Sequence, residues 1–422
     1  YPDTFSDPFP DSKSFSLVVK CFSGSTHPQA LKKILHLHEL HRSYADAKVV
    51  GIVGNDPFFL IHSFKGLKNY RKTQEAELAE LWLNQLHSFV LDSKNNSYTD
   101  SDDSSSKVDL TGTYSSIIRS YAQLRGQEGA AAKAKDILEK MHQILEASKA
   151  SEGSDTVPAN VATVDIKTNC YNLVLSSFRD TKQERYAAEA LVLLQRMVQT
   201  WRNQSNVDVQ SNEYTDAPTP NAQSFELCIE ALAHVPDQKV LLEESERLLL
   251  IYEAMVESAA EMVNGEKISP TVHNTLIEIH AKRFMSIPDL IERVDKIIAR
   301  MTSLSVKYPE MTPDVNTRSL YILVCSVVQQ DAQKKEALLK AENTFKILED
   351  AEKKDPESNG MVDKSYFHMM KAVINLEDNK EKKEERIIEL FQEACQKGLV
   401  NANVLKAFKN QVGEDTFMDI AG

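Results

Sequence analysis

Cysteine, long apolar runs and basic residues are all scarce in this sequence of 422 residues, and each scarcity excludes a class of protein. The five cysteines lie far apart and never form a CxxC pair. This argues against a disulfide framework or a zinc ribbon and favours a reducing compartment. Because no apolar run approaches the roughly 18 residues of a membrane span, we expect a soluble chain without membrane insertion.

Recognisable catalytic motifs are missing as well. The sequence has no GxSxG, HExxH or GKS/T pattern, and it has no zinc signature of a deaminase. His36, His38 and His41 are close in sequence, but only His38 and His41 fall on neighbouring faces of a helix. We therefore expect a protein that is not an enzyme and that needs neither a cofactor nor a metal ion.

Charge is unevenly distributed along the chain. The 49 basic and 62 acidic residues give a net charge of −13, which excludes a surface that coats nucleic acid or an anionic membrane throughout. Residues 1–72 carry ten basic and six acidic side chains, a net of +4, so the remaining 350 residues carry −17. A contact with RNA or an acidic protein would start in the N-terminal part, although a solvated helix face is the simpler interpretation. This basic patch comprises Lys32, Lys33, Arg42, Lys65, Lys68, Arg71 and Lys72.

Pairs of amphipathic segments repeat along the chain. Four segments carry an aromatic or His anchor followed by aliphatic residues at helical spacing. A second amphipathic segment follows each, and it ends on a methionine 26–30 residues after the anchor. The paired helices therefore have nearly constant length. The anchors are Tyr114, Tyr171, Phe225 and His273, and the methionines are Met141, Met197, Met255 and Met301.

Further pairs extend the pattern in both directions. Two later ones are anchored at Arg318 and Tyr366, and two looser ones precede residue 92. The sequence thus predicts an all-α fold, an α-solenoid of about eight helix-turn-helix repeats with long hydrophilic loops between them. The predicted parts are N-terminal, locally basic hairpins at 1–92, an acidic Ser-rich linker at 93–106, the repeat array at 107–398 and a C-terminal tail at 399–422.

Several hairpins carry pieces of a recognisable junction. Pro313-Asp314-Val315-Asn316-Thr317 and Pro220-Asn221 precede two first helices, and Tyr171-Asn172 and His273-Asn274 open two others. These pieces resemble the pentatricopeptide-repeat family over roughly residues 105–398. Tetratricopeptide repeats share the architecture, but their Trp-Leu-Gly and Ala-Phe-Pro positions are missing. The resemblance implies a divergent, RNA-binding member in a mitochondrion or plastid. The chain opens on Tyr1, and no targeting peptide is visible in it.

The resemblance also implies which residues face RNA bases. In that family the residue after each anchor and a residue at the repeat end contact one base of single-stranded RNA. The alternative is that the Asn residues satisfy backbone groups in the first helical turn. The predicted base-facing residues are Ser115, Asn172, Asn221, Glu226, Asn274, Asp314, Ser319 and Phe367, of which Asn221 would partner Asn172 and Asp314 would partner Asn274.

Two functions remain open from the sequence. One is an organellar protein that binds single-stranded RNA and supports its stability, processing or translation. The other is a scaffold that binds proteins as a structural subunit of a large organellar complex, such as a ribosome or a respiratory or photosynthetic assembly. The repeat resemblance favours the first, and the −17 of the main array favours the second.

Overall fold

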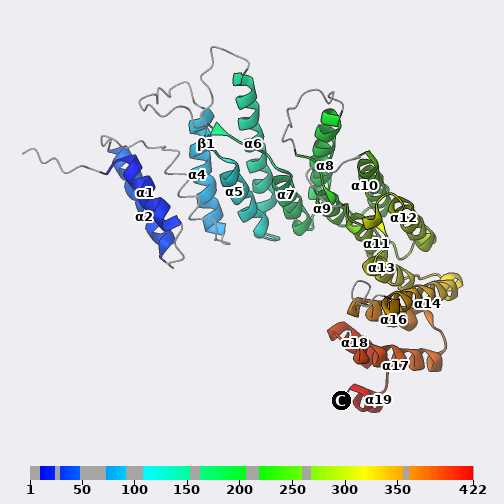
Figure 1. Ribbon diagram of the computed structural model, residues 1–422. Helices are drawn as coiled ribbons and strands as arrows, with labels where there is room; N and C mark the ends of the chain where they lie inside the picture. Colours follow the sequence, from blue (N-terminus) through cyan, green and yellow to red (C-terminus); the bar gives the residue numbers. More distant parts are fainter. Residues whose placement is uncertain are drawn as a thin grey trace, which may run out of the picture. The chain divides into compact units, whose positions relative to one another are not determined.

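The chain is all-α over the residues that the computed structural model describes, as the sequence predicts. Among them are 17 α-helices that pack against their neighbours (Figure 1). Two short strands, β1 (Val108–Asp109) and β2 (Ala162–Thr163), pair in parallel. The described residues are 10–23, 29–47, 73–91, 108–152, 162–205, 218–258, 268–354 and 361–421, so the predicted linker at 93–106 lies outside them.

Contacts divide the chain into two compact units, a first unit at Tyr1–Pro220 and a second unit at Asn221–Gly422. In the first unit α1 packs against α2, α5 against α6 and α7 against α8. Because α5 also packs against α7, two successive hairpins stack through their first helices. The helices of this unit are α1 (Ser12–Ser23), α2 (Ala30–Asp46), α4 (Thr73–Leu91), α5 (Thr111–Gln123), α6 (Ala130–Glu152), α7 (Thr168–Thr181) and α8 (Glu184–Ser205).

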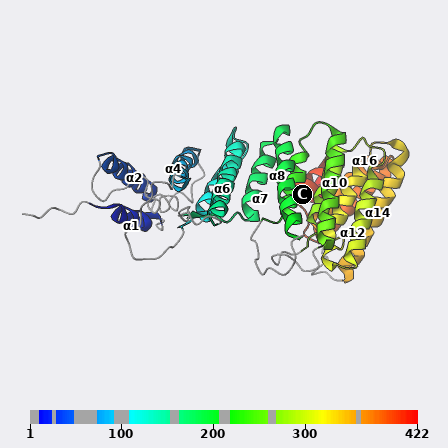
Figure 2. The ribbon, with the colours of Figure 1, turned by 90° about the horizontal axis from the view of Figure 1, so that it is seen from above.

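The second unit repeats this arrangement of stacked helical hairpins. Its first helices α9, α11, α13, α16 and α18 pack one against the next, and each packs against its own second helix (Figures 1 and 2). The helices are α9 (Ala222–Leu232), α10 (Gln238–Ser258), α11 (Thr271–Arg283), α12 (Leu290–Ser305), α13 (Val315–Ser326), α14 (Asp331–Lys354), α16 (Asp363–Leu376), α17 (Lys380–Gln396), α18 (Ala402–Lys409) and α19 (Glu414–Ala421), with a 3-10 turn at Pro309–Met311.

The predicted C-terminal tail contains a further pair of short helices, α18 and α19. The Asn401 side chain accepts hydrogen bonds from the backbone N–H groups of Asn403 and Val404, which starts α18. Phe408 is fully buried and its ring stacks on Phe391 with centroids 3.9 Å apart. The array of helical hairpins therefore continues past residue 398.

The anchors of the first helices lie in the core, with one exception. Arg318 is half-buried, and Tyr321, almost one turn further along α13, is buried in its place. This difference arises because helical periodicity repeats every three to four residues, so it can place an anchor one turn too early. The buried anchors, each at most 1% exposed, are Tyr114, Tyr171, Phe225, His273 and Tyr366.

A polar bond joins a buried ring on several first helices to the second helix of the preceding hairpin. In both units the bond joins a second helix to the first helix of the next hairpin. It holds neighbouring hairpins at a defined position along each other. The partner on the second helix differs between the units: it is a His in the first unit and a carboxylate in the second. The pairs are His87 with Tyr114 at 2.9 Å, His142 with Tyr171 at 2.7 Å, Glu253 with His273 at 2.9 Å and Asp295 with Tyr321 at 2.6 Å.

Candidate functional site

The residues directly after the anchors in the first unit are engaged within the protein. The Ser115 hydroxyl donates to the Thr111 carbonyl at 2.7 Å and lies 3.1 Å from the Cys170 sulfur on α7. Asn172, on α7, is only 4% exposed. Ser115 thus lies where α5 meets α7, and little of Asn172 is presented to solvent.

Two of the predicted repeat-end residues are helix caps. Asn221 accepts a hydrogen bond from the Ser224 backbone N–H at 3.0 Å, and the Ser224 hydroxyl reaches back toward the N–H of Asn221 at 3.2 Å. Asp314 and Thr317 form the same reciprocal pair at the start of α13. Each of these side chains satisfies backbone donors that the first turn of a helix leaves unpaired. At both positions the structure therefore shows a side chain that satisfies backbone groups in the first turn of a helix.

Ser319 and Asn274, in the second unit, are buried. Ser319 is 1% exposed, and both its carbonyl oxygen and its hydroxyl lie within 3.0 Å of Nδ1 of His368 on α16. Its side chain is therefore held by the neighbouring helix and does not face solvent. Asn274 is 4% exposed, and its Oδ1 has no hydrogen-bond partner among the described residues. A buried amide oxygen without a partner is a free acceptor.

Of the residues directly after the anchors in the second unit, Glu226 and Phe367 are the partly exposed ones. They lie with other half-exposed or exposed side chains on one side of their helices, at spacings of three or four residues. The Glu226 carboxylate accepts a hydrogen bond from the Thr271 hydroxyl on α11, which links α9 to α11. We call this surface the first-helix face; it comprises Glu226 and Glu230 on α9, Glu278 on α11, and Lys364, Phe367 and Lys371 on α16.

Opposite charges on the first-helix face are partly removed from water. Burial raises the pKa of Glu226; the Thr271 hydroxyl opposes that shift, and the charge of Glu230 adds to it. Burial also lowers the pKa of Lys371. Glu278 forms an ion pair with Lys282 on its own helix. Neither Glu226 nor Lys371 forms an ion pair with another described residue, so each end of the face carries a charge without a counter-ion.

The predicted basic patch is visible only in part. Lys32, Lys33 and Arg42 are exposed on α2, and the Lys33 ammonium lies 5.2 Å from the ring centroid of Phe22. The other four predicted residues, Lys65, Lys68, Arg71 and Lys72, lie outside the described residues.

Two of the three clustered histidines serve packing. His38 stacks on Trp82 of α4 with centroids 4.5 Å apart, and burial lowers its pKa to about 4. His41 is buried, and its Nε2 lies 3.1 Å from the Ser12 hydroxyl. In the described part of the chain, no group of three His, Cys, Asp or Glu side chains could hold a metal ion.

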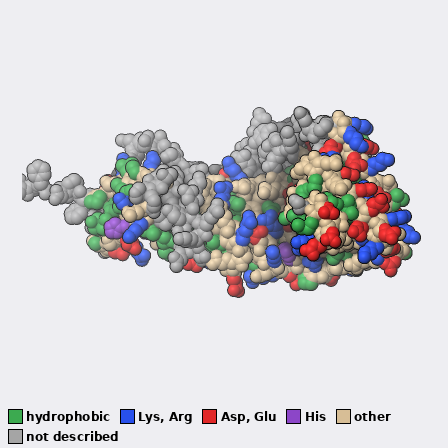
Figure 3. Space-filling model, turned by 90° about the horizontal axis from the view of Figure 1, so that it is seen from below, with side chains coloured by type: hydrophobic (Ala, Val, Ile, Leu, Met, Phe, Trp, Pro, Cys, Tyr) green, Lys and Arg blue, Asp and Glu red, His purple; other side chains and the backbone are tan. Residues whose placement is uncertain are grey.

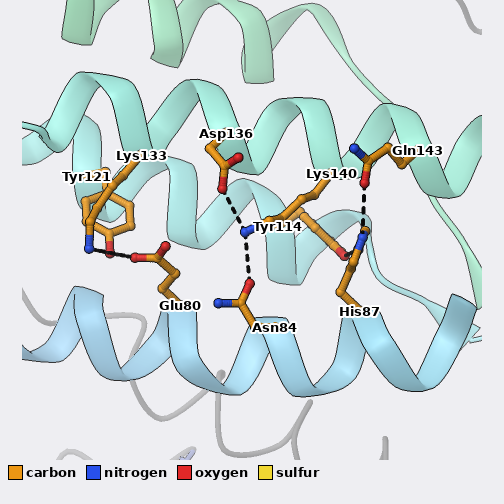
Figure 4. A network of polar contacts seen from close by, with 9 residues as sticks. All are labelled: Glu80, Asn84, His87, Tyr114, Tyr121, Lys133, Asp136, Lys140 and Gln143. Carbon is orange, nitrogen blue, oxygen red and sulfur yellow. Dashed lines mark hydrogen bonds and ion pairs between the residues drawn. The ribbon is translucent and has the colours of Figure 1, made fainter. Parts of the chain in front are cut away.

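A dense polar cluster joins α4 to the α5–α6 hairpin (Figure 4). Glu80 accepts hydrogen bonds from Tyr121 at 2.5 Å and from Lys133 at 2.8 Å. Burial pushes the pKa of Glu80 upward, but these two donors outweigh it, and the pKa lies below its usual value. The pKa of Tyr121 is raised by burial and by Glu80. A protonated tyrosine bonded to a paired carboxylate links neighbouring helices. It is not an activated nucleophile.

Three cysteine thiols are likewise not activated as nucleophiles. Burial raises the pKa of Cys170, and it raises that of Cys325 to about 12. The pKa of the exposed Cys395 is also raised. Because the thiolate is the reactive form, these side chains behave as small hydrophobic residues.

Acidic and basic side chains are interspersed on the face of the second unit that Figure 3 shows. Many form ion pairs within one helix, such as Lys296 with Glu292 on α12, which are 67% and 68% exposed. Pairs of this kind contribute little to stability and leave no single-sign field for a polyanion.

Comparison with protein-family models, with curated proteins and with solved structures finds no match to this chain. Within the described residues, every helix is too short or too polar to cross a bilayer. The function must therefore be argued from the geometry.

Sequence reasoning missed most of the first-helix face. It found Glu226 and Phe367 through their anchors, but it passed over Glu230, Glu278, Lys364 and Lys371. The signal that could have found them is their position, three or four residues from a predicted base-facing residue on the same helix. Applied to α9 and α16, that spacing places an acidic pair at one end and two lysines at the other.

Proposed function

We propose that this chain is a non-enzymatic α-solenoid that binds proteins and serves as a scaffold subunit of a larger assembly. The stacking of first helix on first helix in both units supports the solenoid architecture. Such arrays expose long surfaces that suit extended partners. An organellar assembly is the setting that the resemblance to pentatricopeptide repeats suggests.

The chemistry of the residues predicted to face RNA bases supports this proposal. Single-stranded RNA would need unpaired amides and hydroxyls for its bases and cations for its phosphates. Instead, Ser319 is bonded to His368, and Asn221 and Asp314 cap helices. Glu226 adds a negative charge that repels phosphate. A surface of this kind suits protein side chains better than a polyanion.

RNA binding is our second proposal, and two observations favour it. The free Oδ1 of Asn274 is placed on a first helix directly after the anchor His273, where the family resemblance expects a base reader. Lys32, Lys33 and Arg42 are exposed and could neutralise phosphates at the start of the chain. This function would require short, local RNA contacts and not a continuous footprint along the array.

One experiment separates the two functions. The full-length protein is purified from its native cells at physiological salt, with and without ribonuclease, and its particle size and protein content are measured. We expect a multi-subunit particle that survives ribonuclease. In parallel, the purified chain is titrated with mixed-sequence single-stranded RNA at low salt. Tight binding that weakens steeply with salt, together with a particle that ribonuclease dissolves, would establish RNA as the ligand.

A further inference from the structure

The first-helix face of the second unit has opposite charges at its two ends. Glu226 and Glu230 lie four residues apart on α9, and Lys364 and Lys371 lie seven apart on α16 with Phe367 between them. Spacings of four and seven residues place side chains on the same side of a helix. Each end therefore presents a small charged group, acidic on α9 and basic beside an aromatic ring on α16.

Contacts link the two ends of the first-helix face through the helices between them. The bond between Glu226 and Thr271 joins the open side of α9 to that of α11. Further along, Glu278 of α11 and both Lys364 and Lys371 of α16 lie close enough to His368 to act on its charge. His368 is in turn bonded to Ser319 on α13. The open side of α9 is thus joined to that of α11, and Glu278 of α11 lies near α16 across α13.

One charge at each end, Glu226 on α9 and Lys371 on α16, has no counter-ion among the described residues. Glu226 and Lys371 are half-buried, and both lose hydration without gaining an ion pair from the described residues. A charge held this way interacts more strongly with an incoming opposite charge than a fully solvated one does. A partner that supplies both counter-ions is favoured over one that supplies a single sign, because phosphates would meet Glu226, Glu230 and Glu278.

We propose that the first-helix face binds a segment of a partner protein that carries basic side chains at one end, against α9, and acidic side chains at the other, against α16. The proposal rests on the scaffold function and specifies its partner. Three steps between neighbouring helices at about 8–10 Å each give roughly 24–30 Å between the two ends. A partner segment spans this distance in about 16–20 helical residues or about seven to nine extended ones.

The test begins with panning. A library of random 20-residue peptides displayed on phage is selected against the full-length chain. Selected peptides should carry Lys or Arg toward one end and Asp or Glu toward the other, at a spacing that fits one of the two lengths. Selection against the variant Glu226→Lys/Glu230→Lys should lose the basic end and keep the acidic one. Lys364→Glu/Lys371→Glu should do the reverse.

Affinities then give the size of the effect. A fluorescent copy of one selected peptide should bind each reversal variant about tenfold more weakly or worse, and the milder Glu226→Gln and Lys371→Gln should weaken it in the same direction. Matched controls change the net charge by the same amount on exposed sides of other helices. They are Glu292→Lys/Glu336→Lys and Lys296→Glu/Lys353→Glu, and both should bind the peptide normally. Circular dichroism confirms that each variant is folded.

Three results would overturn the proposal: no selected peptide, selected peptides without the charge pattern, or binding that the reversals leave unchanged. Competition of the peptide by mixed-sequence single-stranded RNA would also overturn it, since the face would then take nucleic acid. A ribonuclease-resistant native particle together with any of the first three results would leave the scaffold function standing and place its contacts elsewhere.

Discussion

At the scale of single residues, the bonds between neighbouring hairpins set stability. The Tyr321 hydroxyl donates to Oδ1 of Asp295 at 2.6 Å, and Lys340 donates to the other oxygen of that carboxylate at 3.0 Å. A hydrogen bond to a charged group contributes about 1.5–3 kcal/mol. We therefore expect Tyr321→Phe to lower the free energy of unfolding by about that amount, measured by urea denaturation followed by circular dichroism.

Tyr308 supplies the matched control. Its hydroxyl is buried without a hydrogen-bond partner among the described residues. Removing such a group leaves no broken bond, so Tyr308→Phe should be neutral or slightly stabilising. Equal destabilisation by both variants would show that the loss comes from ring packing and not from the bond to Asp295.

The residue scale is also where sequence reasoning reached its limit. Helical spacing marked Tyr114, Tyr171 and Phe225 as anchors, and all three are buried, because periodicity reports which side of a helix faces the core. It could not show that Ser319 would be bonded to His368, since the two are 49 residues apart. Contacts of that kind depend on how hairpins stack, which local pattern does not contain.

At the scale of elements, the joint between α13 and α16 should be sensitive to acid. The Ser319 carbonyl can only accept, so Nδ1 of His368 carries a proton and donates to it at 2.9 Å. Burial lowers the pKa of His368 to about 4; the Ser319 bond opposes this, Lys371 and Lys364 lower it further, and Glu278 raises it. An unfolded His has a pKa near 6.5, so the unfolded chain binds more protons between these values.

Stability linked to His368 is therefore fully present above about pH 6.5 and is lost as pH falls toward 4. Between pH 7 and pH 5 the loss should be about 2 kcal/mol. Denaturation at the two pH values should show this difference shrinking in His368→Gln, which cannot take up the extra proton. The control His36→Gln changes a side chain exposed on α2 and should retain the full difference. An unchanged difference in His368→Gln would refute the assignment.

The limits of prediction differ for elements. The paired-helix pattern was sufficient for the hairpins from α5 to α17, because each has a long amphipathic period. It missed α18 and α19, which have eight residues each and too few turns for a period to stand out. The Asn401 cap and the four-residue spacing of Val404 and Phe408 were the signals available.

At the scale of the whole chain, stacked hairpins should unfold in parts and not all at once. Stability in such arrays comes from each hairpin and its contacts with its neighbours, so a local defect need not spread. The main packing of α18 is with α16, α17 and α19, and Phe408 is its largest buried side chain. A defect at Phe408 should therefore stay at the C-terminal end of the second unit.

Phe408→Ala tests this, since removing a buried Phe costs about 3–5 kcal/mol. Hydrogen exchange followed by mass spectrometry should show lost amide protection in α18 and α19, while protection in α9–α12 stays as in the unmodified chain. Leu405→Ala, on the same helix but 38% exposed, should leave α18 nearly as protected as before. Protection lost equally from α9 to α19 would mean that the second unit unfolds as a single cooperative body, because the defect would then have crossed every interface between its hairpins.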